Sequence, residues 1–433
     1  MNAFAVSSRF FRRYRSVLIL CVILAAALVP ALSTGFWLPF RLAYVILLAL
    51  PLCFLWTRLS LLGVHAEIER ATDRLQQGQP LVERVSVQNR SWLSKLWLEV
   101  DEPSDLPGHA IQRVISLRPR QRRSWKAAST CGRRGLYTLG RVAVASGDPF
   151  GLFRFTKSFG RPQSVLVYPR PIELSNLRLP PAELLGEGLL HRPTHYVTSN
   201  AVSVRQYAFG DSYNRIHWPS TARTRELMVK LFEMDPASDV WIVMDLEAKC
   251  QACLPVGKAG SGDESTEEYA VTLAASIASH LSHTSRSVGL MAFGQTLQLV
   301  PPERGLGQYV RILESLAMSR ATGDVSLAQL LNEEGKRFGR HSTVVVLTPS
   351  TQDDWVLSLR VLAERGAKLA TVLIEPGTFG AERDSLVVFG ALAAAGIHTS
   401  VVKCAGDLRA ALASPSGDVQ APAISEATRT GRA

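Results

Sequence analysis

The densest group of residues that could do chemistry lies between Ser203 and Glu233. This segment reads SVRQYAFGDSYNRIHWPSTARTRELMVKLFE, and it mixes basic and aromatic side chains around a turn at Gly210-Asp211. Because arginines offer fork-shaped pairs of donors, the segment predicts a cationic, aromatic docking surface for a carboxylate, a phosphate or a nucleotide of a partner. The plainer alternative is that acidic residues such as Asp211 and Glu226 pair with these bases and that the segment only joins two domains.

An enzyme is the second hypothesis. Its site would lie between Arg205–Arg223 and a sheet edge, and Asp211 or His217 would act as the general acid or base. Histidine is suited to this role because its pKa allows proton transfer near neutral pH. Against it, the Ser, His and Asp residues are too scattered to nominate a triad, and the sequence has no Gly-Lys-Ser/Thr phosphate loop and no dinucleotide-binding glycine pattern. We therefore expect a protein that is not an enzyme and needs no cofactor. A groove for single-stranded nucleic acid would also use interleaved bases and aromatics, but no recognition motif accompanies them, and no nucleic-acid partner is expected.

Cys250 and Cys253, followed by His280 and His283, suggest a zinc site in principle, because two thiolates and two imidazoles can complete a tetrahedron. The gap between the two pairs is longer than in an ordinary zinc finger. Isolated thiols and two histidines on the exposed side of a helix are the preferred interpretation, so no metal is expected.

Two apolar stretches, residues 17–33 and 36–56, are each near the length of about 20 residues that spans a bilayer. Only Thr34 and Gly35 separate them, which predicts a helical hairpin. Basic residues flank both outer ends and the joint carries no charge, so the positive-inside rule places both ends in the cytoplasm of a plasma (inner) membrane. A cleaved signal peptide ending near Ser33 is the alternative for the first stretch, and it would leave the second span in place.

The chain has 433 residues and 48 Lys plus Arg against 37 Asp plus Glu, a formal charge of +11. A hydrophobic content of 47% excludes disorder throughout. Six cysteines are too few for a disulfide-built scaffold, which agrees with a reducing compartment.

Short alternating runs follow the membrane segment, at residues 81–87, 96–100, 136–139 and 164–168. Period-two runs at this density predict a small all-β, sandwich-like domain.

From Val240 onward, apolar strands alternate with helical stretches, which predicts a mainly parallel, doubly wound α/β sheet. Ligands and partners of such sheets meet the carboxyl ends of the strands. We therefore expect a contact rim near Asp245, Thr348 and Glu375.

The expected organisation has five parts. They are a transmembrane hairpin with a basic N-terminus (1–60), a β-sandwich-like domain (61–168), a linker with the signature segment (169–235), an α/β domain (236–413) and a disordered tail (414–433).

Three motifs taken together carry a family resemblance. They are Gly210-Asp211 through Arg215-Ile216-His217-Trp218 to Ala222-Arg223, Asp148-Pro149-Phe150-Gly151-Leu152-Phe153, and Arg134-Gly135-Leu136-Tyr137. In these motifs the chain resembles the bacterial family of the domain of unknown function fifty-eight, and the likeness covers most of its length.

The resemblance implies a C-terminal half similar to von Willebrand factor type A domains and an association with AAA-type ATPases of the MoxR class. It therefore implies a membrane-anchored adaptor or assembly factor. The family signature and docking residues would be Arg205, Tyr207, Gly210, Asp211, Arg215, His217, Trp218 and Arg223.

Type A domains often hold Mg²⁺ at an Asp-x-Ser-x-Ser strand end, with a Thr and an Asp on later loops. Here Glu247 and Lys249 stand where the two serines should be, and Val325 and Pro349 stand at the Thr and Asp positions. A hard cation prefers oxygen ligands, so metal-dependent ligand binding is not expected, and Asp245 is left as a hydrogen-bonded strand-end residue.

Overall fold

The structure is a computed structural model of the whole chain, and it divides into two compact units, residues 1–170 and 171–433. Each unit is described by itself. The described residues are 19–26, 29, 37–174, 177, 201–208, 213, 216–232, 239–254, 264–339 and 342–413.

The first unit begins with a long apolar helix, α2 (Trp37–Leu61). By length and composition α2 could cross a membrane. Of its most apolar stretch of 18 residues, only 17% is buried. Of the first expected span, residues 19–26 and 29 are described and are helical, while the joint at Thr34-Gly35 lies outside the described residues. The structure thus contains one candidate membrane helix within its described part.

A β domain follows α2. Its strands are β1 (Val64–Arg70), β2 (Arg74–Gln76), β3 (Pro80–Asn89), β4 (Lys95–Asp101), β5 (Arg113–Leu117), β6 (Arg122–Thr130), β7 (Gly135–Leu139), β8 (Val142–Gly147), β9 (Arg154–Phe159) and β10 (Gln163–Tyr168). They form three sheets with the orders β1-β3-β6, β5-β4-β8-β9 and β2-β10-β7.

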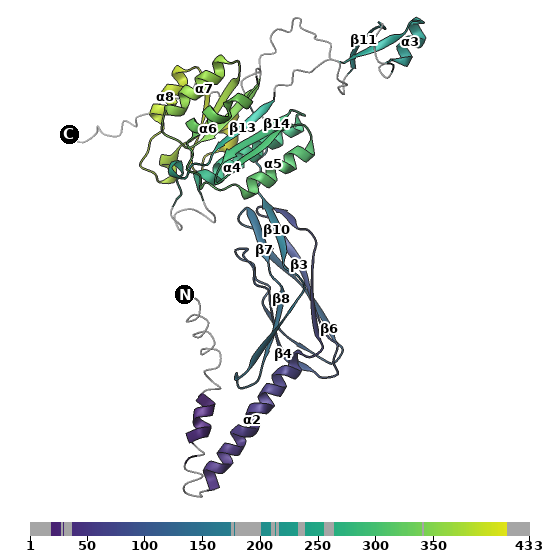
Figure 1. Ribbon diagram of the computed structural model, residues 1–433, viewed down its shortest axis with the longest axis vertical. Helices are drawn as coiled ribbons and strands as arrows, with labels where there is room; N and C mark the ends of the chain where they lie inside the picture. Colours follow the sequence, from purple (N-terminus) through teal and green to yellow (C-terminus); the bar gives the residue numbers. More distant parts are fainter. Residues whose placement is uncertain are drawn as a thin grey trace, which may run out of the picture. The chain divides into compact units, whose positions relative to one another are not determined.

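The first two sheets pack face to face. Val85 and Val87 of one sheet and Leu98, Val100 and Val144 of the other belong to the same buried cluster, as alternating residues of a sandwich should. The third sheet has a separate core, and in Figure 1 β7 and β10 lie at the end of the domain away from α2. The four alternating runs expected from the sequence all fall within strands.

The second unit carries the α/β domain. Its strands are β13 (Val240–Asp245), β14 (Val288–Phe293), β15 (Leu297–Glu303), β16 (Thr343–Thr348), β17 (Lys368–Ile374) and β18 (His398–Val402). Its helices are η2 (Ala248–Cys250), α4 (Thr266–His283), α5 (Leu306–Met318), α6 (Leu327–Glu334), η3 (Gly335–Arg337), α7 (Asp354–Glu364), η4 (Pro376–Phe379), α8 (Leu386–Ala394) and α9 (Leu408–Ala413).

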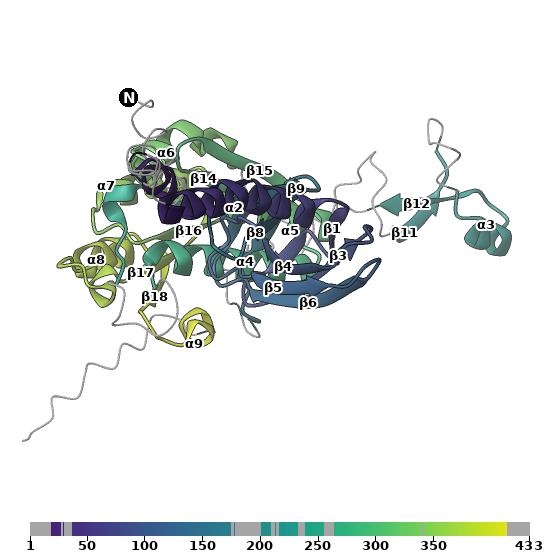
Figure 2. The same ribbon diagram turned by 90° about the horizontal axis from the view of Figure 1, so that it is seen from below.

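The six strands form one sheet with the order β15-β14-β13-β16-β17-β18, parallel except for the edge strand β15. A buried cluster joins one face of this sheet to α6, α7 and α8. On the other face α4 packs against the central strands and against α5. Helices α7 and α8 lie side by side in both views (Figures 1 and 2).

The segment from 169 to 235, expected to be a linker with the signature segment, contains regular structure in its second half. β11 (Ala201–Gln206) pairs antiparallel with β12 (Met228–Phe232), and the short helix α3 (Trp218–Thr224) lies between them in the chain. The first residues after the β domain are also bound to α4, because the Ile172 amide donates to Ser276 Oγ at 2.8 Å. These strands and α3 lie in and next to the signature segment, while residues 175–200, apart from 177, lie outside the described residues. The tail expected to be disordered, 414–433, lies outside the described residues.

Candidate functional site

Asp245 and Thr348 end two neighbouring parallel strands, β13 and β16. The Thr348 hydroxyl donates a 2.6 Å hydrogen bond to Asp245 Oδ2, and the Glu247 amide donates to Asp245 Oδ1 at 3.1 Å. Since β13 connects to β14 on one side and β16 to β17 on the other, the pair sits where the strand order reverses. Two of the three residues expected at the rim are thus in direct contact.

The Asp245 carboxyl group is almost completely removed from solvent, at 2% exposure. This burial raises its pKa to about 6, although the hydrogen bonds from Thr348 and from the Glu247 amide lower it. The negative charges of Glu247 and Asp354 add to the increase. Asp245 is therefore a carboxyl group whose ionised form is costly in the folded chain.

Cys250 extends this group of residues. Its thiol donates to Glu247 Oε2 at 3.3 Å, and burial, followed by the charge of Asp245, raises the pKa of Cys250 to about 12. Asp245, Glu247 and Cys250 present ligand atoms within 4.8 Å of one another. However, the thiol stays protonated and both Asp245 oxygens already accept hydrogen bonds, so the donor set suits a closed internal network better than a cation.

The second half of the suggested zinc set is engaged elsewhere. His280 Nδ1 lies 2.8 Å from the carbonyl oxygen of Leu174, on the segment that follows the β domain. His280 is half-buried, so its expected place on the exposed side of α4 was wrong, while His283 is exposed. The described contacts do not join either histidine to Cys250 or Cys253.

Glu375, the third rim residue, follows β17. Its carboxylate accepts a hydrogen bond from Ser385, and its amide donates to the Val402 carbonyl oxygen at 2.8 Å. Among the described contacts none joins Glu375 to Asp245 or Thr348. Glu375 thus organises the start of α8 rather than the Asp245 network.

Two open depressions flank the loop at residues 250–253. One, of about 420 Å³, is lined by this loop and by residues 379–383. The other, of about 340 Å³, is lined by Gln251, Ala252, Cys253, Ser265, Glu267, Glu268, Arg320 and Ala321. The loop that continues from Ala321 packs tightly on neighbouring backbone, because a Cβ at Gly323 would lie 2.8 Å from the Phe293 carbonyl oxygen. The carboxyl edge is thus built by closely packed loops, with shallow surfaces between them.

The signature segment is described only in part. Gly210, Asp211 and Arg215 lie outside the described residues, and Arg205 is placed in β11 by its backbone alone. The Tyr207 ring stacks on that of Tyr213, with centroids 5.8 Å apart.

The remaining signature residues lie at α3. His217 precedes the helix, and its Nδ1 lies 2.7 Å from Ser220 Oγ, while its amide donates to the Met228 carbonyl oxygen. Trp218 and Arg223 are exposed on the helix. His217 thus has a local structural partner, and among the signature residues whose side chains are described, the exposed ones are Trp218 and Arg223.

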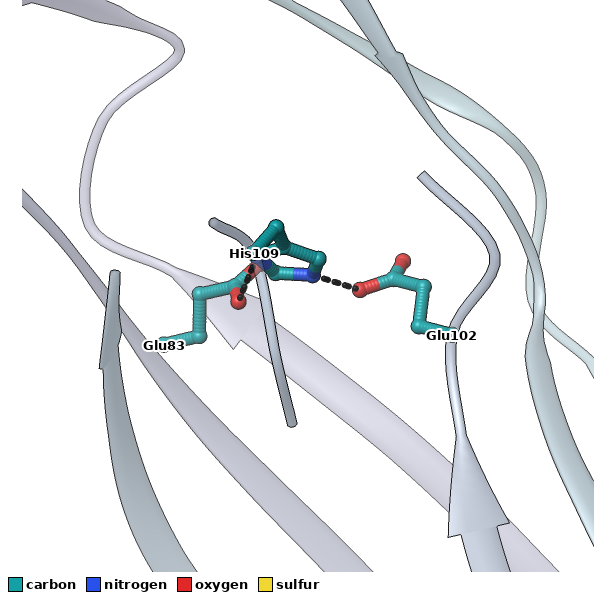
Figure 3. Close-up of side chains that lie close together, drawn as sticks. All are labelled: Glu83, Glu102 and His109. Carbon is teal, nitrogen blue, oxygen red and sulfur yellow. Dashed lines mark hydrogen bonds and ion pairs between the residues drawn. The ribbon is translucent and has the colours of Figure 1, made fainter. Parts of the chain in front are cut away.

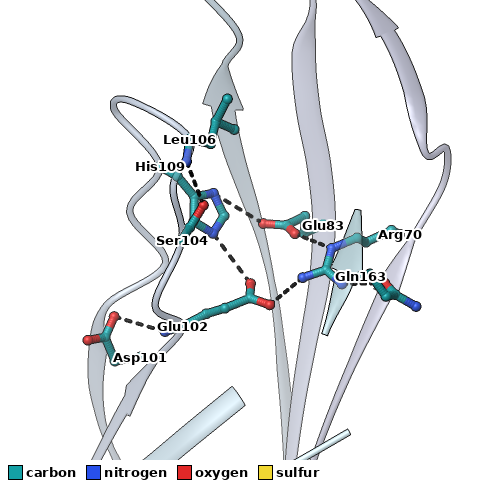
Figure 4. Close-up of polar contacts among 8 residues, drawn as sticks. All are labelled: Arg70, Glu83, Asp101, Glu102, Ser104, Leu106, His109 and Gln163. Atoms are coloured by element: carbon teal, nitrogen blue, oxygen red, sulfur yellow. Dashed lines mark hydrogen bonds and ion pairs between the residues drawn. The ribbon is translucent and has the colours of Figure 1, made fainter. Parts of the chain in front are cut away.

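Sequence reasoning missed a buried polar cluster inside the β domain, drawn in Figures 3 and 4. Arg70 Nε lies 2.6 Å from Glu83 Oε1, and the same guanidinium contacts Glu102. His109 sits between the two carboxylates, with Nε2 3.3 Å from Glu102 and Nδ1 3.7 Å from Glu83 (Figure 3). The sequence did contain one sign of this cluster. Glu83 occupies an inward-facing position of the alternating strand β3, where a charged side chain needs a buried partner.

This cluster presents three ligand-type atoms, from Glu83, Glu102 and His109, within 4.8 Å of one another. Arg70 already occupies one oxygen of each carboxylate, and the two imidazole nitrogens face different carboxylates. The geometry fits an ion-pair network that ties β1, β3 and the loop after β4 together.

Comparison with known proteins gives two sequence matches. The family described as "Protein of unknown function DUF58" matches residues 203–378, which include the signature segment and most of the sheet. The uncharacterised protein YeaD of Bacillus subtilis (strain 168) is 28% identical over 245 residues. That alignment covers 56% of this chain and 56% of YeaD, so the matched region spans about half of the relative's length.

Similar solved structures cover smaller parts of the chain. The CARDB domain of a Pyrococcus furiosus protein, crystallised with di-metal ions, is 16% identical with a TM-score of 0.19, over 24% of this chain and 86% of that one. The C-terminal domain of wzt is 13% identical with a TM-score of 0.20, over 24% of this chain and 73% of that one. At these scores neither likeness bears on function.

Proposed function

We propose that this chain, which belongs to the DUF58 family through residues 203–378, is a membrane-anchored adaptor that docks an AAA-type ATPase of the MoxR class. One observation carries the proposal. Helix α8 has the sequence LVVFGALAA, without a polar or charged side chain, yet only Val388 and Leu392 are buried. A helix that is apolar all round normally lies inside a protein or against a partner.

Exposed apolar side chains also lie on the helix α7, which contacts α8. Leu386 and Val387, in the first turn of α8, are each 70% exposed, and Leu357 and Val361 on the neighbouring α7 are also exposed. We call these four residues the α7/α8 patch. Both helices begin at the carboxyl edge of the sheet, so the patch adjoins the rim that contains Asp245 and Thr348. Large apolar side chains exposed on two neighbouring helices are typical of protein-binding surfaces.

The nature of the partner follows from the family resemblance and from the sequence. The chain carries no Gly-Lys-Ser/Thr phosphate loop, so ATP hydrolysis in such a system would belong to the partner. The exposed Trp218 and Arg223 of α3 supply a second, cationic contact for the same ATPase.

The proposal includes a type A-like fold and a cytoplasmic location for the folded domains. The parallel sheet, with an aspartate at the end of its first strand and the Gly323 loop beside Glu247, is in keeping with a type A-like domain whose metal loop is degenerate. The apolar α2 and the basic residues flanking the two apolar stretches support a two-span hairpin. Protease added outside intact cells should therefore leave the region beyond Leu59 uncut.

The test is photocrosslinking of the full chain in its own membrane. A photoreactive amino acid replaces Leu386 in one variant and Leu306 in a control. Leu306 is a matched position, because it is also the first residue of a helix of the same domain and is 69% exposed, but α5 packs on the other face of the sheet. The Leu386 variant should form a covalent adduct with an AAA-type ATPase, identified by mass spectrometry, and the Leu306 variant should not.

The reciprocal test uses Leu386→Glu and Leu306→Glu. Leu386→Glu should abolish co-purification of the ATPase from detergent extract, while Leu306→Glu should leave it intact, with both variants retaining the circular dichroism of the parent. An ATPase recovered equally by both variants, or by neither the variants nor the parent, would refute docking at this patch.

A further inference from the structure

The last part of α2 is already in contact with the β domain. Cys53, Thr57, Ser60 and Leu61 are buried, and Lys95 at the start of β4 donates a hydrogen bond to the Leu59 carbonyl oxygen. A helix needs about 20 residues to cross the hydrocarbon core, so a span that begins at Trp37 extends to about Trp56. The β domain therefore touches the helix within the length that the membrane requires.

The point of contact can be specified from the aromatic rings. The Phe54 ring packs edge-on against Phe153 and Phe155, with centroids 5.6 and 5.5 Å apart. Phe153 closes the β8–β9 turn, residues 148–153, which we call the hairpin tip. Because Phe54 lies before the end of the span, the hairpin tip lies at the depth of the membrane boundary.

The hairpin tip is built to present an apolar side chain. The Asp148 carboxylate accepts hydrogen bonds from the Phe150 amide at 3.0 Å and from the Phe153 amide at 2.6 Å. Gly151 adopts a φ of +69° and donates its amide to the Asp148 carbonyl oxygen. These amides are satisfied within the turn, as a turn near hydrocarbon requires. Phe150, at the apex, is 75% exposed and contributes nothing to the core of the domain.

We infer that the hairpin tip inserts into the headgroup region of the bilayer, with Phe150 as the buried side chain, and so holds the β domain against the membrane surface. This inference rests on the membrane anchoring proposed above and assigns a role to the Asp148–Phe153 motif. A single exposed phenylalanine is ordinary on a protein surface. The packing of Phe54 on Phe153 places the turn that carries Phe150 at the membrane boundary, which makes the bilayer the partner of this side chain.

The loop between β3 and β4 also exposes residue types that are common at membrane surfaces. Trp92, between β3 and β4, is 82% exposed, and the adjacent Arg90 donates its amide to the carbonyl oxygen of Gly63, just after α2. The Arg120 amide donates to the Ser91 carbonyl oxygen, which brings a second exposed arginine to the same place. Tryptophan and arginine beside a membrane helix favour an interface with anionic headgroups.

The test places an environment-sensitive fluorophore on the full chain in vesicles of zwitterionic and anionic phospholipid. The parent for labelling has the accessible cysteines replaced, as Cys21→Ser, Cys253→Ser and Cys404→Ser. Phe150→Cys receives the label, and Leu136→Cys is the control, because Leu136 is 58% exposed on β7, in the sheet whose core is separate from the face-to-face pair. Vesicle flotation reports anchoring independently.

The label at position 150 should emit at shorter wavelength than the label at 136 and be quenched several-fold more strongly by a nitroxide on the lipid. Water-like emission at 150, equal to that at 136, in a chain that floats with the vesicles would overturn the insertion while leaving membrane anchoring intact. A chain that does not float would overturn both.

Discussion

The Thr348 hydroxyl and the Asp245 carboxylate form a 2.6 Å hydrogen bond between residues 103 positions apart in the chain. It joins the carboxyl ends of β16 and β13, at the point where the order of the sheet reverses. Ser350 continues the network, since its amide donates to Thr348 Oγ1 at 2.9 Å. The pair holds together the loops that form the rim next to the α7/α8 patch.

Replacing Asp245 by Asn should stabilise the α/β domain at neutral pH. Burial raises the pKa of Asp245 from 3.8 to about 6, so the folded state binds more protons than the unfolded state between these values. The stabilising contribution is complete below pH 3.8 and is lost as the pH rises through 6. At 1.36 kcal/mol for each pKa unit, the loss amounts to about 2–3 kcal/mol.

Asn retains an acceptor for the Glu247 amide and carries no charge, so Asp245→Asn should remove this pH dependence. Hydrogen exchange of peptides from β13, corrected for intrinsic rates, measures the local unfolding free energy from pH 4 to 8. An unchanged slope between pH 4 and 6.5 in Asp245→Asn would contradict the assignment.

Thr348→Val should destabilise the domain at pH 7.5 by about 1–3 kcal/mol, because the buried carboxylate loses a donor. The loss of unfolding free energy should be smaller when Thr348→Val is made in the Asp245→Asn chain, because residue 245 then carries no negative charge for the hydroxyl to stabilise. Exchange rates of β16 peptides in the four chains complete a double-mutant cycle, which also cancels the shared loss of the Ser350 contact. A coupling energy of zero would mean that the hydrogen bond does not serve the charge.

Arg70→Met should destabilise the β domain by about 3–5 kcal/mol, because Glu83 and Glu102 would stay buried without their guanidinium partner. Arg154→Gln is the control, since it removes an exposed ion pair with Glu99 and should cost less than about 1 kcal/mol. Urea unfolding of the full chain in detergent, followed by exchange of β3 peptides, compares the two. Equal losses would show that the cluster has no special energetic role.

Cys250 and Cys253 should differ sharply in reactivity. Burial raises the pKa of Cys250 to about 12, so almost none of it is thiolate at pH 8, whereas Cys253 is exposed. Iodoacetamide should alkylate Cys253 much faster, as measured by peptide mass spectrometry over time. Comparable rates, or protection of both thiols by added zinc, would favour the dithiol or zinc interpretation instead.

The fold was largely predictable from local patterns. Alternating residues identified β3, β4, β7 and β10, and apolar strands separated by helical stretches predicted the parallel sheet. Strands such as β6, with the sequence RRSWKAAST, were missed because charged side chains cover much of their exposed face. β12 was hidden in a segment rich in bases, where pairing with β11 rather than periodicity defines the structure.

The sequence alone determined the apolar helix α2, the classes of the two domains and the placement of Asp245 and Thr348 at one edge, because parallel strands bring their carboxyl ends together. Only the tertiary structure decided how those side chains are used. Pairing of the Asp245 oxygens, burial of Glu83 beside His109 and exposure of Leu386 all depend on which faces pack and in what register. Such contacts join residues far apart in the chain, and no local pattern encodes them.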